Sequence, residues 1–278
     1  MKDARLPLLS ALLLALILPT LTSCQVDDTQ QLPERSYELV WSDEFDGDAG
    51  TAPDPEKWIY NVGTGQNGWG NGELQYYTDR TDNAALDGDG HLVITARREG
   101  FAGAGFTSAR LTTEGKFQQT YGRFEARLKT PYGPGIWPAF WMLGADYQTN
   151  TWPQCGEIDL MELRGQEPSV INGTVHGPGY SAGNAVGGTY ALENGRYDEA
   201  FHVFAVEWEP ESIDFYVDEV LYRRITPDDV PGEWVYDHDF FLLLNIAVGG
   251  NYVGFPTSQT PFPQEMIVDY VRVLQRAD

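Results

Sequence analysis

The sequence is poor in cysteine, basic residues and histidine, and each shortage excludes or disfavours a class of structure or partner. Two cysteines, Cys24 and Cys155, argue against a disulfide framework, and Cys155, with no basic neighbour in sequence, is predicted to be a small buried residue. The four histidines have no metal-ligand spacing. Only 18 basic residues stand against 41 acidic ones, giving a formal net charge of −23. This charge disfavours nucleic acid and acidic polymers as partners and favours a neutral substrate, unless a local positive patch overrides it.

The chain also lacks a long apolar run. Lys2 and Arg5 precede an apolar stretch over residues 6–18, which is too short to span a membrane but suits a signal peptide. It leads to Leu21-Thr22-Ser23-Cys24, which resembles a bacterial lipobox, where the chain is cut before the cysteine and the cysteine is acylated. We predict a lipoprotein signal peptide over residues 1–23. An ordinary secretory signal cut nearby is the alternative.

The residues after Cys24 are expected to connect the lipid to the fold. Residues 24–36 are polar and contain proline, which is typical of a flexible tether. Several acyl chains on one cysteine hold a protein on a membrane where a single chain does not. We therefore expect an exported protein anchored to a bacterial membrane. Gln25 after Cys24 is compatible with the outer membrane or cell surface in a diderm cell. Without acylation the protein would be secreted.

From residue 37 onward, short β-rich runs alternate with clusters of Gly, Pro, Asn and Asp. In the clearest run Phe124, Ala126 and Leu128 face one way, and the charged residues between them face the other. Similar runs occupy residues 91–97, 202–208, 213–217, 240–248 and 266–273, and no segment shows a sustained helical period. This pattern predicts one all-β domain over residues 37–276, built as an antiparallel sandwich or barrel.

One run, Glu157-Ile-Asp159-Leu-Met-Glu162, interleaves three carboxylates with bulky apolar residues. On a strand Glu157 and Asp159 share one face, but strict alternation would put Glu162 in the core, where an unpaired carboxylate is costly. A β-bulge near Leu160 or Met161 adds one residue and returns Glu162 to the face of the other two. The run therefore predicts three carboxylates on one sheet face, with a bulge between the second and third.

Two neighbouring carboxylates are what retaining glycoside hydrolysis needs: one attacks the anomeric carbon, and the other protonates the leaving oxygen. The alternative interpretation of the run is a structural acidic cluster or a cation site. Nearby tryptophans favour the first interpretation, because sugar rings stack on indoles. Trp137 and Trp141, four residues apart on a predicted strand, would share a face, and Trp152 lies just before the acidic run.

At this point the sequence resembles glycoside hydrolase family 16, in particular its laminarinase-like members. The resemblance covers nearly all of residues 37–275. It is carried by residues 41–45 (WSDEF), 69–77 (WGNGELQYY), 107–110 (TSAR), 121–125 (YGRFE), 137–143 (WPAFWML), 156–162 (GEIDLME), 174–176 (TVH), 245–250 (NIAVGG) and 268–273 (VDYVRV). The six-residue acidic run resembles the bulged subgroup of laminarinases and agarases.

The resemblance implies a β-jelly roll of two curved antiparallel sheets with a glycan cleft on the concave face. It implies Glu157 as nucleophile, Glu162 as general acid/base and Asp159 as the assisting carboxylate, with no cofactor for catalysis. The glycan contacts that it implies are Asn71, Glu73, Arg110, Trp137, Trp141, Trp152, His176 and Asn245. It also suggests a structural calcium ion on the convex side, held by Glu44, the carbonyl of Gly88 and Asp269.

These residues predict a monomeric retaining endo-hydrolase of β-1,3-glucan, with mixed-linkage 1,3-1,4-glucan as a further substrate. Two alternatives stay open: hydrolysis of an algal galactan such as agar, and transglycosylation. A non-catalytic glycan-binding module on the same fold is disfavoured because both glutamates are present.

Overall fold

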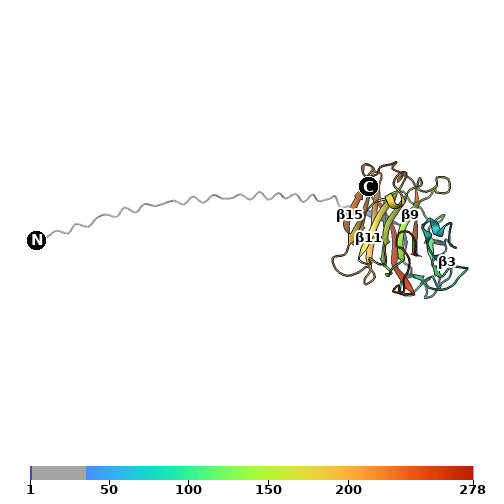
Figure 1. Ribbon diagram of the computed structural model, residues 1–278. Coiled ribbons are helices and arrows are strands. Elements are labelled where there is room, and N and C mark those ends of the chain that lie inside the picture. The colour runs from blue at the N-terminus through green and yellow to red at the C-terminus, as the bar shows by residue number, and fades with distance from the viewer. Residues whose placement is uncertain (2–35, 278) are drawn as a thin grey trace. The chain divides into compact units, whose positions relative to one another are not determined.

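The computed structural model describes Met1 and residues 36–277, and these residues form an all-β structure (Figure 1). The first strand begins at Tyr37 and the last ends at Arg276. Apart from Met1, the predicted signal peptide over residues 1–23 lies outside the described residues, as do Cys24 with its predicted lipid and most of the tether. Within the described part of the chain there is no helix of the length and apolar character that a membrane span needs.

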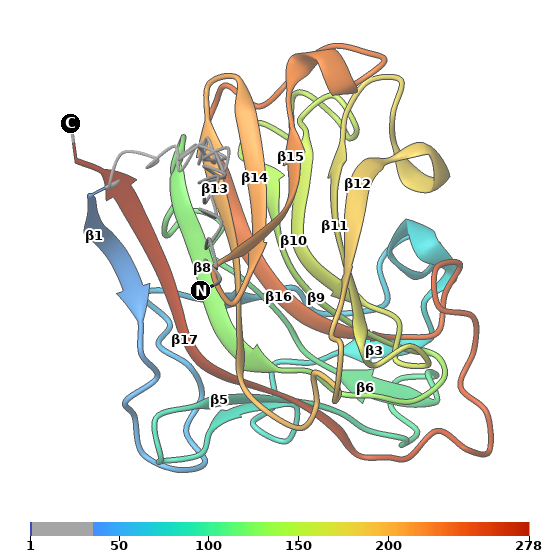
Figure 2. The same ribbon diagram turned by 90° about the vertical axis from the view of Figure 1, so that its left-hand side faces the viewer.

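Two antiparallel sheets make up the fold (Figure 2). In spatial order the first contains β15 (Val220–Ile225), β14 (Ser212–Val217), β13 (His202–Glu209), β8 (Gly122–Lys129), β17 (Gln264–Arg276), β5 (Leu92–Ala96) and β4 (Ala84–Leu86), with β1 (Tyr37–Asp43) also paired to β17. The second contains β12 (Val186–Ala191), β11 (Val170–His176), β10 (Glu157–Leu163), β9 (Ile136–Gly144), β16 (Phe240–Val248), β7 (Arg110–Thr112) and β2 (Ile59–Tyr60).

The remaining elements are short. β3 (Gln75–Tyr77) and β6 (Phe106–Ser108) form a small parallel pair, and three helical turns, η1 (Gly68–Gly72), η2 (Ala182–Asn184) and η3 (Pro227–Asp229), lie between strands. Each sheet joins consecutive strands, such as β13–β15 and β9–β12, to strands far apart in sequence, such as β8 with β17 and β9 with β16, as in a jelly roll. The predicted all-β jelly-roll sandwich is therefore confirmed.

The core lies between the two sheets and follows the alternation read from the sequence. On β8, Phe124, Ala126 and Leu128 are fully buried. All nine residues of β16 are buried, because this strand lies inside its sheet between β9 and β7. Burial on both faces makes β16 a rigid support for the surface that it shares with β9 and β10.

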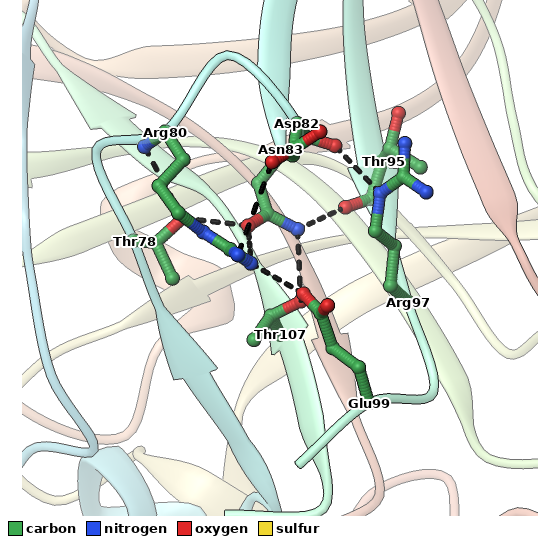
Figure 3. A network of polar contacts seen from close by, with 8 residues as sticks. All are labelled: Thr78, Arg80, Asp82, Asn83, Thr95, Arg97, Glu99 and Thr107. Carbon is green, nitrogen blue, oxygen red and sulfur yellow. Dashed lines mark hydrogen bonds and ion pairs between the residues drawn. The ribbon is translucent and has the colours of Figure 1, made fainter. Parts of the chain in front are cut away.

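A buried asparagine, Asn83, ties the segment after β3 to β5 and β6 (Figure 3). Asn83 is fully buried, and its Oδ1 accepts hydrogen bonds from Thr78 Oγ1 at 2.6 Å and Arg80 Nη2 at 3.0 Å. Its Nδ2 donates to the Thr95 carbonyl at 2.9 Å and to Thr107 Oγ1 at 3.0 Å. All its hydrogen-bonding positions are used, so burial leaves no unpaired group on this side chain. The network fixes β6, and β7 follows β6 directly in the chain.

Candidate active site

β10 has the predicted bulge. Asp159 pairs with Thr174 of β11 and Glu162 pairs with Asn172, so β10 places two residues where β11 places one. The register with β9 shifts at the same place. The extra residue keeps Leu160 and Met161 in the core and leaves Glu162 only partly buried. The bulge between Asp159 and Glu162 is therefore confirmed.

Contacts from the neighbouring strands orient the three carboxylates. Asp159 accepts a hydrogen bond from Thr174 Oγ1 at 2.6 Å, and its Oδ2 lies 3.0 Å from His176 Nε2. The same nitrogen lies 3.7 Å from Glu157 Oε1. On the other side of the bulge, Trp137 Nε1 donates to Glu162 Oε1 at 2.8 Å. Asp159 and His176 thus lie on the side of Glu157, and a tryptophan holds Glu162.

Burial and mutual repulsion raise the pKa values of both glutamates. Burial is the largest cause, and the charge of Asp159 is the next; together they raise the pKa of Glu157 to about 7 and that of Glu162 to about 8. The hydrogen bond from Trp137 opposes the rise at Glu162. Because the charge of one glutamate affects the pKa of the other, the two titrate as a coupled pair. The lower pKa of Glu157 favours the state in which Glu157 is ionised and Glu162 is protonated.

The ring of His176 contacts Asp159 through Nε2 and the backbone of Ala182 through Nδ1, and the two contacts favour different protonation states. Burial lowers its pKa, but the hydrogen bond to Asp159 and the charges of Asp159 and Glu157 outweigh burial and raise the pKa to about 9. However, Nδ1 accepts the backbone N–H of Ala182 at 3.0 Å, which a cationic ring could not do because both its nitrogens carry protons. At neutral pH this contact favours the neutral ring, with its proton on Nε2 facing Asp159, over the cation that a pKa of about 9 alone would give.

Glu157, Asp159 and His176 could also present one ligand atom each to a metal, because these atoms lie within 4.8 Å of one another. The hydrogen bond from Ala182 weakens this alternative, since it keeps the proton of His176 on Nε2, where a metal would need a free lone pair. The geometry fits a hydrogen bond from Nε2 to Asp159 better than a metal ligand set.

A second cluster of site residues is built around Arg110 at the start of β7. Its guanidinium carbon lies 4.5 Å from the ring centroid of Trp69 and 4.8 Å from that of Trp141. Trp141 Nε1 donates to Asn245 Oδ1 at 2.8 Å. Burial lowers the pKa of Arg110, although the charge of Glu73 acts against this. The cation is thus held between two indoles in a position set by β7, β9 and β16.

Glu73 lies beside this group, directly after η1. Its carboxylate accepts hydrogen bonds from Gln75 Nε2 at 2.6 Å, Asn71 Nδ2 at 3.2 Å and Tyr77 OH at 3.3 Å. Burial raises its pKa, while the hydrogen bonds from Gln75 and Asn71 lower it. Gln75 in turn accepts the backbone N–H of Val248, which ties this segment to β16.

The remaining predicted contact, Trp152, is 43% exposed, and its ring centroid lies 6.0 Å from that of His176. An exposed indole beside buried carboxylates can stack on a sugar ring. The predicted glycan contacts come from several elements: Trp137 and Trp141 from β9, His176 from β11, Arg110 from β7, Asn245 from β16, Asn71 and Glu73 from η1 and the residue after it, and Trp152 from the segment before β10.

Two aromatic residues of the site were not singled out from the sequence. Trp69 stacks on Arg110, and it stands in the WGNGELQYY segment that carried part of the resemblance. Tyr252 packs against Trp137 with ring centroids 5.0 Å apart, and its hydroxyl accepts a hydrogen bond from Asn172 Nδ2 at 2.8 Å. Nothing in the local sequence signals Tyr252, because its contacts come from residues about 80 and 115 positions away.

Away from this site, the residues expected to bind calcium are arranged differently from the expectation. Glu44 accepts two hydrogen bonds from Arg272, at 2.9 and 2.8 Å, and Asp269 accepts one from Arg127. A Cβ atom built on Gly88 would lie 2.9 Å from the Cβ atom of Ala49 and 3.0 Å from its backbone nitrogen. Calcium needs six to eight oxygen ligands, and here arginines already neutralise both carboxylates. As placed, these residues do not fit a calcium ion unless both ion pairs open.

The fold and the site together define a class of enzyme. A jelly roll whose sheet face carries two glutamates of raised pKa, an assisting aspartate and several tryptophans has the groups that glycoside hydrolysis requires. The model of glycosyl hydrolases family 16 matches residues 71–260. The chain is 46% identical over 274 residues to a protein named beta-glucanase from Rhodothermus marinus, covering 93% of each chain.

Solved structures agree. The catalytic domain of an endo-1,3-beta-glucanase (laminarinase) from Thermotoga petrophila RKU-1 superposes with a TM-score of 0.83 at 46% identity, covering 88% of this chain and 100% of that one. The endo-beta-1,3-glucanase from Pyrococcus furiosus gives 0.82 at 44% identity, covering 89% and 100%. The chain belongs to glycosyl hydrolase family 16 and is a glycoside hydrolase, which confirms the family expected from the sequence.

Proposed function

We propose that this chain is a retaining endo-hydrolase of β-1,3-glucan that also acts on mixed-linkage 1,3-1,4-glucan. The observation that carries the proposal is the bulged strand β10, which presents Glu157, Asp159 and Glu162 beside Trp137. The names of similar proteins point to the same substrate class. Neutral glucan also suits a chain with a net charge of −23, which would repel sulfated polymers.

In the first step the Glu157 carboxylate attacks the anomeric carbon and the bond to the leaving oxygen breaks. Glu162 gives that oxygen its proton, so the departing glucan leaves as an alcohol. The glycosyl group is then an ester of Glu157. In the second step Glu162, now ionised, takes a proton from water, and the resulting hydroxide attacks the same carbon and releases Glu157. Two inversions restore the β configuration.

Asp159 and His176 do not bond to the sugar carbon in this scheme. The negative charge of Asp159 raises the pKa of both glutamates, which helps Glu162 to hold its proton. His176 donates from Nε2 to Asp159 and so limits the rotation of that carboxylate. Thr174 donates to the same oxygen. These contacts keep the middle carboxylate fixed between the two that react.

Product analysis on laminarin, lichenan and agarose tests the substrate. We expect short oligosaccharides from laminarin early in the reaction, slower cleavage of lichenan, and no products from agarose. NMR of the first products should show the β-anomer. Cleavage of agarose in preference to laminarin would favour the galactan alternative, and longer products formed from added acceptor sugars would favour transglycosylation. An α-anomer would contradict the retaining mechanism.

The raised pKa values predict a bell-shaped pH profile of kcat/KM. Protonation of Glu157, with a pKa of about 7, lowers activity on the acid side, and ionisation of Glu162, with a pKa of about 8, lowers it on the alkaline side. In Asp159→Asn a charge that raises both values is absent, so both limbs should move to lower pH. Asp48→Asn, on an exposed loop, is the matched control. Limbs that stay in place in Asp159→Asn would refute this role for the aspartate.

Treatment with a chelator tests the predicted calcium site at Glu44, Gly88 and Asp269. Because Arg272 and Arg127 hold Glu44 and Asp269, we expect a chelator such as EDTA to leave the unfolding temperature unchanged. A bound ion would stabilise the folded state by mass action, and its removal would lower the unfolding temperature. A drop that added calcium reverses would restore the calcium site at Glu44, Gly88 and Asp269.

We further propose, from the sequence alone, that Cys24 carries the lipid and that the monomeric enzyme works at a bacterial surface. Cys24→Ala should move the protein from the membrane fraction to the soluble one. Continued membrane association of that variant would contradict acylation at Cys24.

A further inference from the structure

The segment that follows β16 forms a wall beside the Asn71–Glu73 end of the site. A Cβ atom built on Gly250 would lie 3.1 Å from the Asn71 carbonyl oxygen, 3.5 Å from the ring of Trp137 and 3.6 Å from Glu73 Cγ. The N–H of Asn251 donates to the same carbonyl at 2.8 Å. The backbone here therefore touches three of the residues expected to contact glycan.

Hydrogen bonds hold this segment in place. The N–H of Gly249 donates to the Gly135 carbonyl at 2.7 Å, and the N–H of Gly254 donates to that of Gly250 at 2.9 Å. Gln166 Nε2 donates to the Val253 carbonyl at 3.1 Å, and the Val253 side chain is buried. The segment is thus a fixed loop, and residues that project from it have a defined position.

Phe255 projects from this loop and is 62% exposed, next to Leu74, which is 37% exposed. Both side chains lie over Gly249: a Cβ atom built there would meet Leu74 Cγ at 2.9 Å and Phe255 Cδ1 at 3.2 Å. Leu74 directly follows Glu73 in the chain. An exposed aromatic ring and an exposed leucine in one place form an apolar patch next to the polar end of the site.

We propose that Phe255, supported by Leu74, is a glucan-binding subsite that extends the cleft beyond Asn71 and Glu73. The proposal rests on the proposed function, because the occupant is the same β-glucan chain. The patch is uncharged and aromatic, which matches the C–H faces of sugar rings. It adjoins the Asn71–Glu73 end of the site, because Leu74 follows Glu73 in the chain and Gly250 lies against Asn71, Trp137 and Glu73.

The arrangement of the chain supports this occupant. Figure 2 shows the segment after β16 on the same side of the second sheet as η1. A long glucan that crosses the cleft therefore meets the patch without a change of face. A ring that the loop already holds in position loses little freedom on binding, so its stacking contributes directly to affinity.

The test compares a long and a short substrate. In Phe255→Ala we expect KM for laminarin to rise about tenfold, the ratio that corresponds to roughly 1.4 kcal/mol of lost stacking. The kcat on laminarin, and both constants on laminaritetraose, should equal those of the wild type. Phe255→Trp should restore the laminarin KM. Leu39→Ala on β1, where the side chain is 55% exposed, is the matched control and should change nothing.

Each other outcome is decisive. An unchanged laminarin KM in Phe255→Ala, or an equal rise on both substrates, overturns the subsite. Loss of a concentration-dependent dimer in sedimentation velocity, with KM unchanged, would assign the patch to contact between copies and would also overturn it. Failure of the wild-type protein to cleave laminarin would reject the proposed function instead. Equal unfolding temperatures of the variants confirm that the comparison is between folded proteins.

Discussion

Glu157→Gln is expected to lower kcat on laminarin by about 10⁴-fold or more, because the amide cannot form the glycosyl ester and no other group is placed to replace it. Glutamine has the shape of glutamate, so binding of laminarin and the unfolding temperature should persist. Initial rates of reducing-end formation, with laminarin binding measured separately, check both parts. Glu193→Gln, an exposed glutamate between β12 and β13, is the control for the chemical change.

Stereochemistry makes the test of Glu157 sharper. With an activated β-glycosyl donor and azide, a Glu157→Ala variant should form an α-glycosyl azide, since the small anion can enter the space that the carboxylate had occupied and attack from that face. A β-azide, or more than a few per cent of wild-type turnover without azide, would mean that another residue is the nucleophile.

Glu162→Gln is expected to lower kcat on laminarin by about 10²- to 10⁴-fold, the usual contribution of a general acid/base. Here the first step should survive on a donor with a nitrophenyl leaving group, because that group departs without a proton. The glycosyl ester should then accumulate, since no base activates water. Mass spectrometry of the intact protein would detect the added glycosyl mass on the variant.

Azide again separates the two roles. It needs no base, so it should release the ester of Glu162→Gln as a β-glycosyl azide, the opposite anomer to that from Glu157→Ala. Trp137→Phe is a useful companion, since it removes the N–H that Glu162 accepts at 2.8 Å and leaves both carboxylates in place. An α-azide from Glu162→Gln would require the roles of the two glutamates to be exchanged.

The strand pattern and the centre of the site could be read from the sequence because they depend on local alternation. Phe124, Ala126 and Leu128 alternate with charged residues, and all three are buried. The spacing from Glu157 to Glu162 is one residue longer than alternation permits, and the bulge follows from the cost of burying a carboxylate. Such features need no knowledge of which strands are neighbours.

The parts that could not be derived depend on long-range pairing. Arg110 lies between Trp69 and Trp141 only because β7 pairs with β16, which pairs with β9. Tyr252 reaches Trp137 in the same indirect way. Individual strands carry no signal for these contacts, so the sequence indicates the residue types but not their partners.

The calcium expectation came from the resemblance to the family and took no account of neighbouring cations. Glu44 and Asp269 carry suitable oxygen atoms, but whether they are available depends on the cations that the sheet places beside them. β17 brings Arg272 to Glu44, and β8 brings Arg127 to Asp269. Competition between an arginine and a metal for one carboxylate becomes apparent only when the strand register is known.

The bulge in β10 has a consequence for the folding of the sheet, because it changes the parity of the strand. Before it, the odd-numbered Glu157 and Asp159 are the acidic positions and Ile158 is buried; after it, the even-numbered Glu162 is acidic and Leu163 is buried. A slip of one residue along β9 or β11 would drive carboxylates into the core from whichever half of β10 moved. In a strand without a bulge, residues of one parity face the core along its whole length. In β10 the parity changes at the bulge, so the half before it and the half after it each disfavour a wrong register. The extra residue that brings Glu162 beside Glu157 and Asp159 therefore also disfavours a wrong register between β10 and its neighbouring strands.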